Sequence, residues 1–181
     1  HSDSGIEGFL TVQGAKYTTA RLAAEKVVDK VLEKRGHTPK KSLTSVTPIH
    51  GGEIADFDGF VRFGLPKNGQ NLEESTFRHL LYNHGSAYAG VPRYLDSDHI
   101  EKTITGSEVL KAEVINGIRE EMACTLSDVV FRRTDLGTAG HPGTEALRIC
   151  AELVSAELGW SPDRTQAEIE TTNRAFRIVS R

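Results

Sequence analysis

The spacing of apolar residues divides the first part of the chain into a short extended stretch and a long amphipathic helix. Residues 8–12 are rich in aromatic and β-branched side chains, which predicts a β-strand. Gly14 breaks this stretch, and Thr18 and Thr19 then offer hydroxyls that can cap a helix ending at Gly36. The apolar residues of that helix recur at helical spacing: Ala24, Val27, Val28, Val31 and Leu32. The predicted order is therefore strand, tight turn and helix.

The rest of the chain shows helical periodicity after a stretch of loop composition. Residues 37–71 are rich in glycine and proline, which is typical of linkers and loops. Beyond them, apolar stripes predict helices over 72–84, 107–124, 125–136, 143–158 and 161–179. Helices joined by short loops bury such stripes against one another. The expected fold is mainly α, with a small helical bundle over 72–181 preceded by a strand–turn–helix remnant of an α/β domain over 1–36.

The composition is that of an ordinary globular protein. Of 181 residues, 38% are hydrophobic and 26% are charged, and the formal net charge is −3. This charge gives no basic field for nucleic-acid binding, and no apolar run approaches the length of a membrane span. Cys124 and Cys150 lie far apart in helical patterns, so we expect free thiols and a reducing, cytoplasmic location.

Most motifs that define an active site are absent from the sequence. It contains no G-x-G-x-x-G after the opening strand, no phosphate-binding P-loop, no C-x-x-C and no H-E-x-x-H. His79 and His84 are five positions apart, which does not place them on one face of a straight helix, and no metal site is predicted. Arg132 and Arg133 are expected to pair with nearby acids, and Trp160 to be a packing residue.

The turn over residues 14–19 is the candidate for chemistry. A glycine turn that leads into a helix leaves backbone N–H groups unpaired at the positive end of the helix dipole. Such an end suits a phosphate, a carboxylate or the electron-rich edge of a flavin, and Lys16 adds a cation beside it. An ordinary β–α connection with a surface lysine would have the same sequence, so both interpretations stay open on these residues alone.

Four segments, in order, resemble FAD-dependent glycerol-3-phosphate dehydrogenases. The run GFLTVQGAKYTTARLAAEKVVDKV is similar to the end of their flavin domain, where a strand precedes a Gly-Gly-Lys-x-Thr-Thr-Tyr-Arg motif and a helix. TPIHGGEIADF resembles the linker that follows, and LLYNHGSAYAGV resembles a helix end in the C-terminal region. The fourth segment, REEMACTLSDVVFRRTDLG followed by SAELGWSPDR, resembles the helical C-terminal domain. The resemblance covers nearly the whole chain, with two departures in the first motif at Ala15 and Ala20.

The resemblance implies oxidation of sn-glycerol 3-phosphate to dihydroxyacetone phosphate, with FAD as the cofactor and a quinone as the electron acceptor. It places Gly14, Lys16, Thr18 and Thr19 at the isoalloxazine end of the flavin, and Lys16 also near the substrate phosphate. Residues 1–36 would then end the FAD-binding domain, 37–71 would link, and 72–181 would form the C-terminal domain. No residue of this chain is assigned a catalytic role, and Arg21 is expected to pair with an acid.

Two other functions stay open. An oxidase of the same family would give its electrons to oxygen, and a non-catalytic helical module would serve interaction or dimerisation. Since the only methionine is Met122, we expect the chain to be a piece of a longer protein that binds FAD weakly or not at all by itself. Further candidate partners are a second copy of the chain and, peripherally, the inner face of the cell membrane. The row of lysines at 26, 30 and 34 is interleaved with acids, which disfavours that membrane contact.

Overall fold

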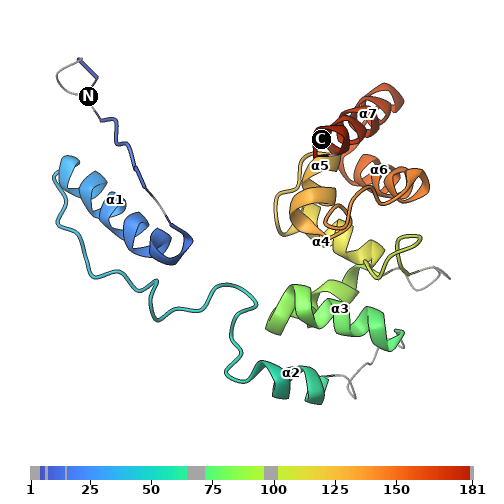
Figure 1. Ribbon diagram of the computed structural model, residues 1–181, viewed down its shortest axis with the longest axis horizontal. Helices are drawn as coiled ribbons and strands as arrows, with labels where there is room; N and C mark the ends of the chain where they lie inside the picture. Colours follow the sequence, from blue (N-terminus) through green and yellow to red (C-terminus); the bar gives the residue numbers. More distant parts are fainter. Residues whose placement is uncertain (1–4, 7, 15, 65–71, 96–101, 180–181) are drawn as a thin grey trace. The chain divides into compact units, whose positions relative to one another are not determined.

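The computed structural model describes residues 5–6, 8–14, 16–64, 72–95 and 102–179 (Figure 1). The chain divides into two compact units, an N-terminal unit of residues 1–49 and a C-terminal unit of residues 50–181. The described residues are helical and contain no strand beyond a single isolated β-bridge between Thr103 and Leu110. The mainly α fold is therefore confirmed. No helix in the described part of the chain is both long and apolar enough to cross a membrane.

The N-terminal unit is one helix with a short 3₁₀ turn before it. The 3₁₀ helix η2 covers Tyr17–Thr19 and leads directly into α1, Ala20–Lys34. Gly36 has a positive φ of 75°, and the amide of His37 returns to the carbonyl of Leu32, which closes the helix end as predicted. These contacts confirm the predicted helix.

The predicted strand at residues 8–12 is wrong for this chain. Its residues have no regular secondary structure. A strand needs a neighbour to receive its backbone hydrogen bonds, and the described residues of this unit provide no second strand.

The C-terminal unit contains six α-helices among its described residues. These are α2 (Phe57–Gly64), α3 (Glu74–His84), α4 (Lys111–Arg119), α5 (Leu126–Asp128), α6 (Thr144–Leu158) and α7 (Pro162–Val179). A 3₁₀ helix, η4, covers Gly85–Tyr94, and a π-helix, η5, covers Val129–Arg133. Helix α2 lies inside the stretch predicted as linker, while the domain boundaries at 36 and 71 stay predictions.

The predicted helix over 107–124 is shorter in the structure. Gly106 has a φ of 74°, and the amide of Ile104 donates to the carbonyl of Val109, so the chain makes a tight turn before α4 begins at Lys111. The helix then ends at Arg119, and Met122 adopts a φ of 60°, which is rare for a residue with a side chain. Apolar residues on this turn are buried without being helical.

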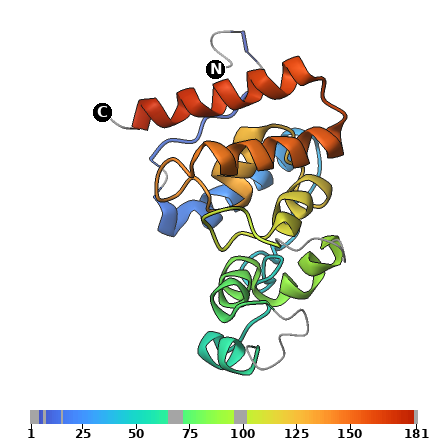
Figure 2. The same ribbon diagram turned by 90° about the vertical axis from the view of Figure 1, so that its right-hand side faces the viewer.

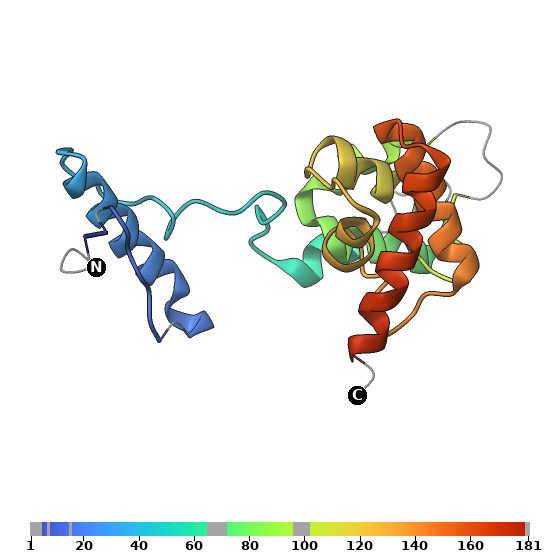
Figure 3. The same ribbon diagram turned by 90° about the horizontal axis from the view of Figure 1, so that it is seen from above.

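Two hydrophobic clusters form the core of the C-terminal unit, and α4 borders both. The first is built around α4 to α7, which pack together at one end of the unit (Figures 2 and 3). It consists of Ile104, Val109, Val114, Ala123, Leu126, Val129, Val130, Leu136, Ala146, Leu147, Cys150, Ala151 and Val154. The second joins α2, α3 and η4 to the start of α4, and consists of Val61, Leu72, Phe77, Leu80, Leu81, Val91, Leu110 and Ala112. Trp160 packs against the first cluster, which confirms its predicted role.

Candidate functional site

The turn before α1, where the sequence predicts a ligand site, is exposed at its described residues. Gly14 has a φ of 72°, and the space that a Cβ would occupy there is empty to 4 Å. Residues with side chains rarely adopt this conformation, so glycine suits the position. The departure at Ala15 lies outside the described residues. Lys16, Thr18 and Thr19 follow within four exposed positions, so three of the predicted residues lie together at the start of the helix.

The polar groups at this helix end are arranged differently from the prediction. Thr19 is the N-cap of α1, but its hydroxyl donates to the carbonyl of Lys16 at 3.1 Å and does not cap the first turn. The first turn of α1 contains no acidic residue that would compete for an anion. Lys16 forms no ion pair with any described residue. A cationic side chain and an acid-free helix start are therefore both accessible to a ligand.

Arg21 is already engaged within the unit. Its guanidinium lies 2.7 Å from the carboxylate of Glu25 and 3.1 Å from the hydroxyl of Thr44. This pairing is what we expected for Arg21. It also helps to hold residues 37–44 along α1, where a groove of about 570 Å³ is lined mainly by apolar atoms.

A second polar site, which the sequence did not predict, lies in the C-terminal unit. The carboxylate of Glu113 on α4 is 1% exposed, and its Oε1 is 2.9 Å from Nε2 of His84 and 3.5 Å from Nε2 of His79. Its Oε2 accepts a hydrogen bond of 2.7 Å from the amide of Leu110. Although the histidines are five positions apart, both reach one carboxylate because α3 ends at His84, where the chain turns into η4.

The charges of this site support one another. Burial alone would raise the pKa of Glu113, but the hydrogen bonds from His79, His84 and Leu110 lower it to about 2. Burial would likewise lower the pKa of His79, yet its hydrogen bond to Glu113 and the negative charges of Glu113, Asp135 and Glu108 raise it. Glu113 is therefore an anion at neutral pH, and it favours the protonated form of His79.

His84 also borders a cleft of about 580 Å³. The cleft lies between the end of α3, the 3₁₀ helix η4 and the end of α4. Its polar lining includes His50, Asn83, His84, Arg93, Asn116, Glu120 and Glu121. No group of three or more histidine, cysteine, aspartate or glutamate side chains within the described residues is arranged to hold a metal ion.

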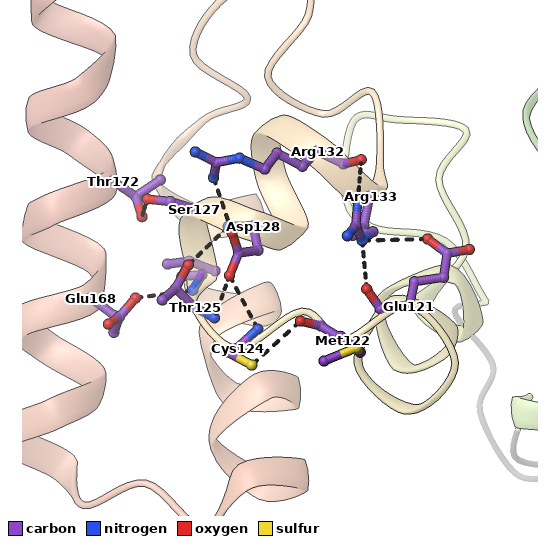
Figure 4. A network of polar contacts seen from close by, with 11 residues as sticks. Glu121, Met122, Cys124, Thr125, Ser127, Asp128, Arg132, Arg133, Glu168 and Thr172 are labelled. Carbon is purple, nitrogen blue, oxygen red and sulfur yellow. Dashed lines mark hydrogen bonds and ion pairs between the residues drawn. The ribbon is translucent and has the colours of Figure 1, made fainter. Parts of the chain in front are cut away.

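A network of hydrogen bonds fixes the turn before α5 (Figure 4). The carboxylate of Asp128 accepts from the amides of Cys124 and Thr125 at 3.1 and 3.0 Å, and Arg132 lies 3.0 Å from it. Arg133 donates to the carbonyl of Glu121 at 2.9 Å and lies 3.7 Å from the carboxylate of the same residue. The predicted ion pairs of both arginines are thus present, and this network serves to hold the turn in place.

Comparison with known proteins identifies the class. Residues 11–165 match the family described as the C-terminal domain of alpha-glycerophosphate oxidase, and the chain belongs to this family. The glycerol-3-phosphate dehydrogenase of Synechocystis sp. is 26% identical over 173 residues, which cover 94% of this chain and 31% of that protein.

Two eukaryotic relatives match at higher identity. The mitochondrial glycerol-3-phosphate dehydrogenase of Rattus norvegicus is 31% identical over 180 residues, covering 96% of this chain and 24% of that protein. A Dictyostelium discoideum protein described as "Probable glycerol-3-phosphate dehydrogenase, mitochondrial" is 31% identical over 176 residues, covering 96% of this chain and 27% of that protein. The chain therefore spans 24–31% of the length of these relatives, and the resemblance noted in its motifs is confirmed.

Proposed function

We propose that this chain is the C-terminal part of a flavoprotein that oxidises sn-glycerol 3-phosphate to dihydroxyacetone phosphate. The relatives named glycerol-3-phosphate dehydrogenase support this reaction class, because they match almost the whole chain. In this reaction C2 of the substrate loses a hydride and its hydroxyl loses a proton. FAD, when bound, supplies the hydride acceptor, and a quinone takes the electrons onward.

The exposed apolar stripe of α1 is the structural observation that best supports the proposal. Helix α1 has no buried residue, and Val28 on its apolar stripe is 56% exposed. An amphipathic helix gains its stability mainly by burying that stripe against another element. In a complete FAD-binding domain, a neighbouring sheet would cover α1 and would also give residues 8–12 a partner strand.

The residues at the start of α1 fit a flavin site. Gly14 would let the backbone approach the ring system closely, because no side chain occupies that space. Lys16 would place its ammonium beside the substrate phosphate or the pyrimidine edge of the flavin, where negative charge develops. Thr18 and Thr19 would contribute hydroxyls and the positive end of the helix dipole. Ala20 stands where the family motif has tyrosine, and its small side chain leaves this edge more open.

The isolated chain should be inactive in this proposal. Its relatives are three to four times longer, and the adenine- and phosphate-binding parts of a flavin site are expected in that additional length. We therefore expect weak FAD binding or none, and no turnover, from residues 1–181 alone.

An oxidase is the alternative that a specific observation favours. The matching family is described by an alpha-glycerophosphate oxidase, whereas the relatives are dehydrogenases. The two differ in the final electron acceptor, which is oxygen for the oxidase. A non-catalytic interaction module, a homodimer and contact with the inner face of the cell membrane stay proposals as well.

The test is a visible absorption spectrum of the full-length parent protein before and after sn-glycerol 3-phosphate is added. Flavin bands that bleach on addition support the proposal, and peroxide formation in air then distinguishes the oxidase from the quinone-linked enzyme. A parent that remains colourless after incubation with FAD would contradict it. The 181-residue chain serves as the control and should show no flavin bands.

A further inference from the structure

Helix α3 presents a row of polar side chains to carboxylates from three other segments. Thr76 donates a hydrogen bond to Glu108, which precedes α4. His79 lies between Glu113 on α4 and Asp135, which follows η5, with Nδ1 3.6 Å from the Asp135 carboxylate. Thr76 and His79 are three positions apart and lie on one side of α3, and His84 reaches Glu113 from the end of the helix.

The charge of this contact depends on the imidazole of His79. Glu113 and Asp135 each have histidine as their ion-pair partner. When His79 is protonated, both carboxylates face a cation at short range. When His79 is neutral, Glu108, Glu113 and Asp135 surround it without that compensation, and Glu113 stays buried. An uncompensated buried carboxylate is strongly unfavourable.

We propose that this contact is a pH-sensitive latch, in which protonated His79 holds α3 against α4 and loss of its proton releases it. The contact joins the two hydrophobic clusters, because α4 borders both while α3 belongs to the second. The latch also controls the cleft, because Asn83 and His84 at the end of α3 form one wall of it.

Other charged groups near His84 among the described residues do not form ion pairs with Glu113 that could take over its contact with the histidines. On its cleft side lie His50, Arg93, Glu120 and Glu121. Arg93 is paired with Glu120 and with the hydroxyl of Tyr94, and Glu121 lies 3.7 Å from Arg133. On α3 itself, Arg78 pairs with Glu74 at 2.8 Å. The permanent cations in the vicinity thus have carboxylate partners of their own.

The direction of the pH effect follows from His79. Its pKa is raised in the folded chain, so its contribution to stability is complete below the unfolded value of 6.5 and is lost as the pH rises through the folded value. The latch is therefore closed in mildly acidic solution and opens on the alkaline side. The opening constant should rise by up to about tenfold for each unit by which the pKa of His79 is higher in the closed form.

The experiment measures amide hydrogen exchange of α3 in the 181-residue chain at about pH 5.5 and pH 8, with rates corrected for the intrinsic effect of pH. In the wild type, protection of Glu74–His84 should fall on going to the higher pH, while protection of α6 should not change. In His79→Gln the dependence of α3 on pH should be largely lost. The matched control, His37→Gln, removes an exposed histidine of the N-terminal unit and should leave the pH dependence of α3 unchanged.

Two further measurements test the latch. A nuclear magnetic resonance titration should show that His79 holds its proton to higher pH in the wild type than in Glu113→Gln. If Glu113→Gln does not fold, Asp135→Asn, whose side chain is 48% exposed, should show a smaller effect in the same direction. Protection of α3 that is the same at both pH values, or that falls equally in His79→Gln, would overturn the latch.

Discussion

The backbones of Gly51 and Gly85 are in direct contact in the C-terminal unit. The carbonyl of Gly51 accepts a hydrogen bond of 2.9 Å from the amide of Ser86, and a Cβ on Gly85 would overlap that same carbonyl oxygen. Both glycines have positive φ, 77° and 52°. This contact joins two segments that the sequence places more than thirty positions apart, and it lies beside His50 and His84 at the cleft.

The first prediction follows from this contact. Gly85→Ala should lower the free energy of unfolding by at least about 2 kcal/mol, because the methyl group meets backbone and the residue keeps an unfavourable φ. Gly90→Ala on the same 3₁₀ helix is the control, since no atom lies within 4 Å of its added methyl group. Urea unfolding followed by circular dichroism measures both. Equal stabilities of the two variants would show that the contact can relax.

A second prediction concerns the buried carboxylate of Glu168 on α7. It accepts a hydrogen bond of 3.0 Å from the buried amide of Leu126 and lies 2.6 Å from Arg164 (Figure 4 shows its position beside Thr125). Glu168→Ala should lower the free energy of unfolding by about 1–3 kcal/mol, because the amide of Leu126 then has no acceptor. Glu170→Ala, on the exposed side of the same helix, should change stability by less than about 0.5 kcal/mol. Comparable losses in the two variants would contradict this role.

Short-range patterns predicted the helices well and the polar site poorly. Helices α1, α3, α6 and α7 follow from apolar spacing within single segments. The strand predicted at residues 8–12 is absent from the structure, because a strand depends on a neighbouring strand, which a short-range pattern does not reveal. Helix α2 was missed since the glycines and prolines around it are typical of loops.

The site around Glu113 needed tertiary information. Its carboxylate and its histidines are separated by 29 positions or more, and Glu113 reads as an ordinary exposed acid of an amphipathic helix. The five-residue spacing of His79 and His84 keeps them off a common face only on a straight helix, whereas α3 ends at His84. By contrast, the acids that pair with Arg132 and Arg133 lie within 12 positions of them in the sequence, so these ion pairs could be predicted.

The third prediction concerns the acid side of the stability profile. The pKa of Glu113 is lowered from 4.5 to about 2 on folding, so its contribution is complete above the unfolded value and is lost as the pH falls through the folded one. The free energy of unfolding should therefore fall by about 3 kcal/mol between roughly pH 5 and pH 2. Glu113→Gln should be less stable than the wild type at about pH 6 and should lose less stability on acidification. Parallel profiles for the two proteins would contradict the assignment.

The fourth prediction separates the two cysteines, which are both free thiols. Cys150 is fully buried, and burial raises its pKa to about 12, so it should stay protonated and unreactive at about pH 8. Cys124 is exposed at the turn before α5. A thiol reagent should therefore modify one cysteine in the native chain and two after denaturation. Cys124→Ser should remove the native reaction, and rapid native labelling of that variant would contradict the buried position of Cys150.

The last prediction tests the proposed flavin site in the full-length parent protein. Lys16→Ala should reduce kcat/KM for sn-glycerol 3-phosphate by about 10²–10³, because a cation that stabilises developing charge is lost at the reacting end of the cofactor. Lys30→Ala is the matched control, since Lys30 lies on the same N-terminal unit and its ion-pair partner among the described residues is Glu33, at 2.8 Å. It should retain the wild-type rate. If Lys16→Ala binds FAD and turns over like the control, Lys16 is only a surface residue of a β–α connection. If it loses FAD entirely, the lysine holds the cofactor, and its effect on the substrate must be measured with Lys16→Arg, which keeps the charge.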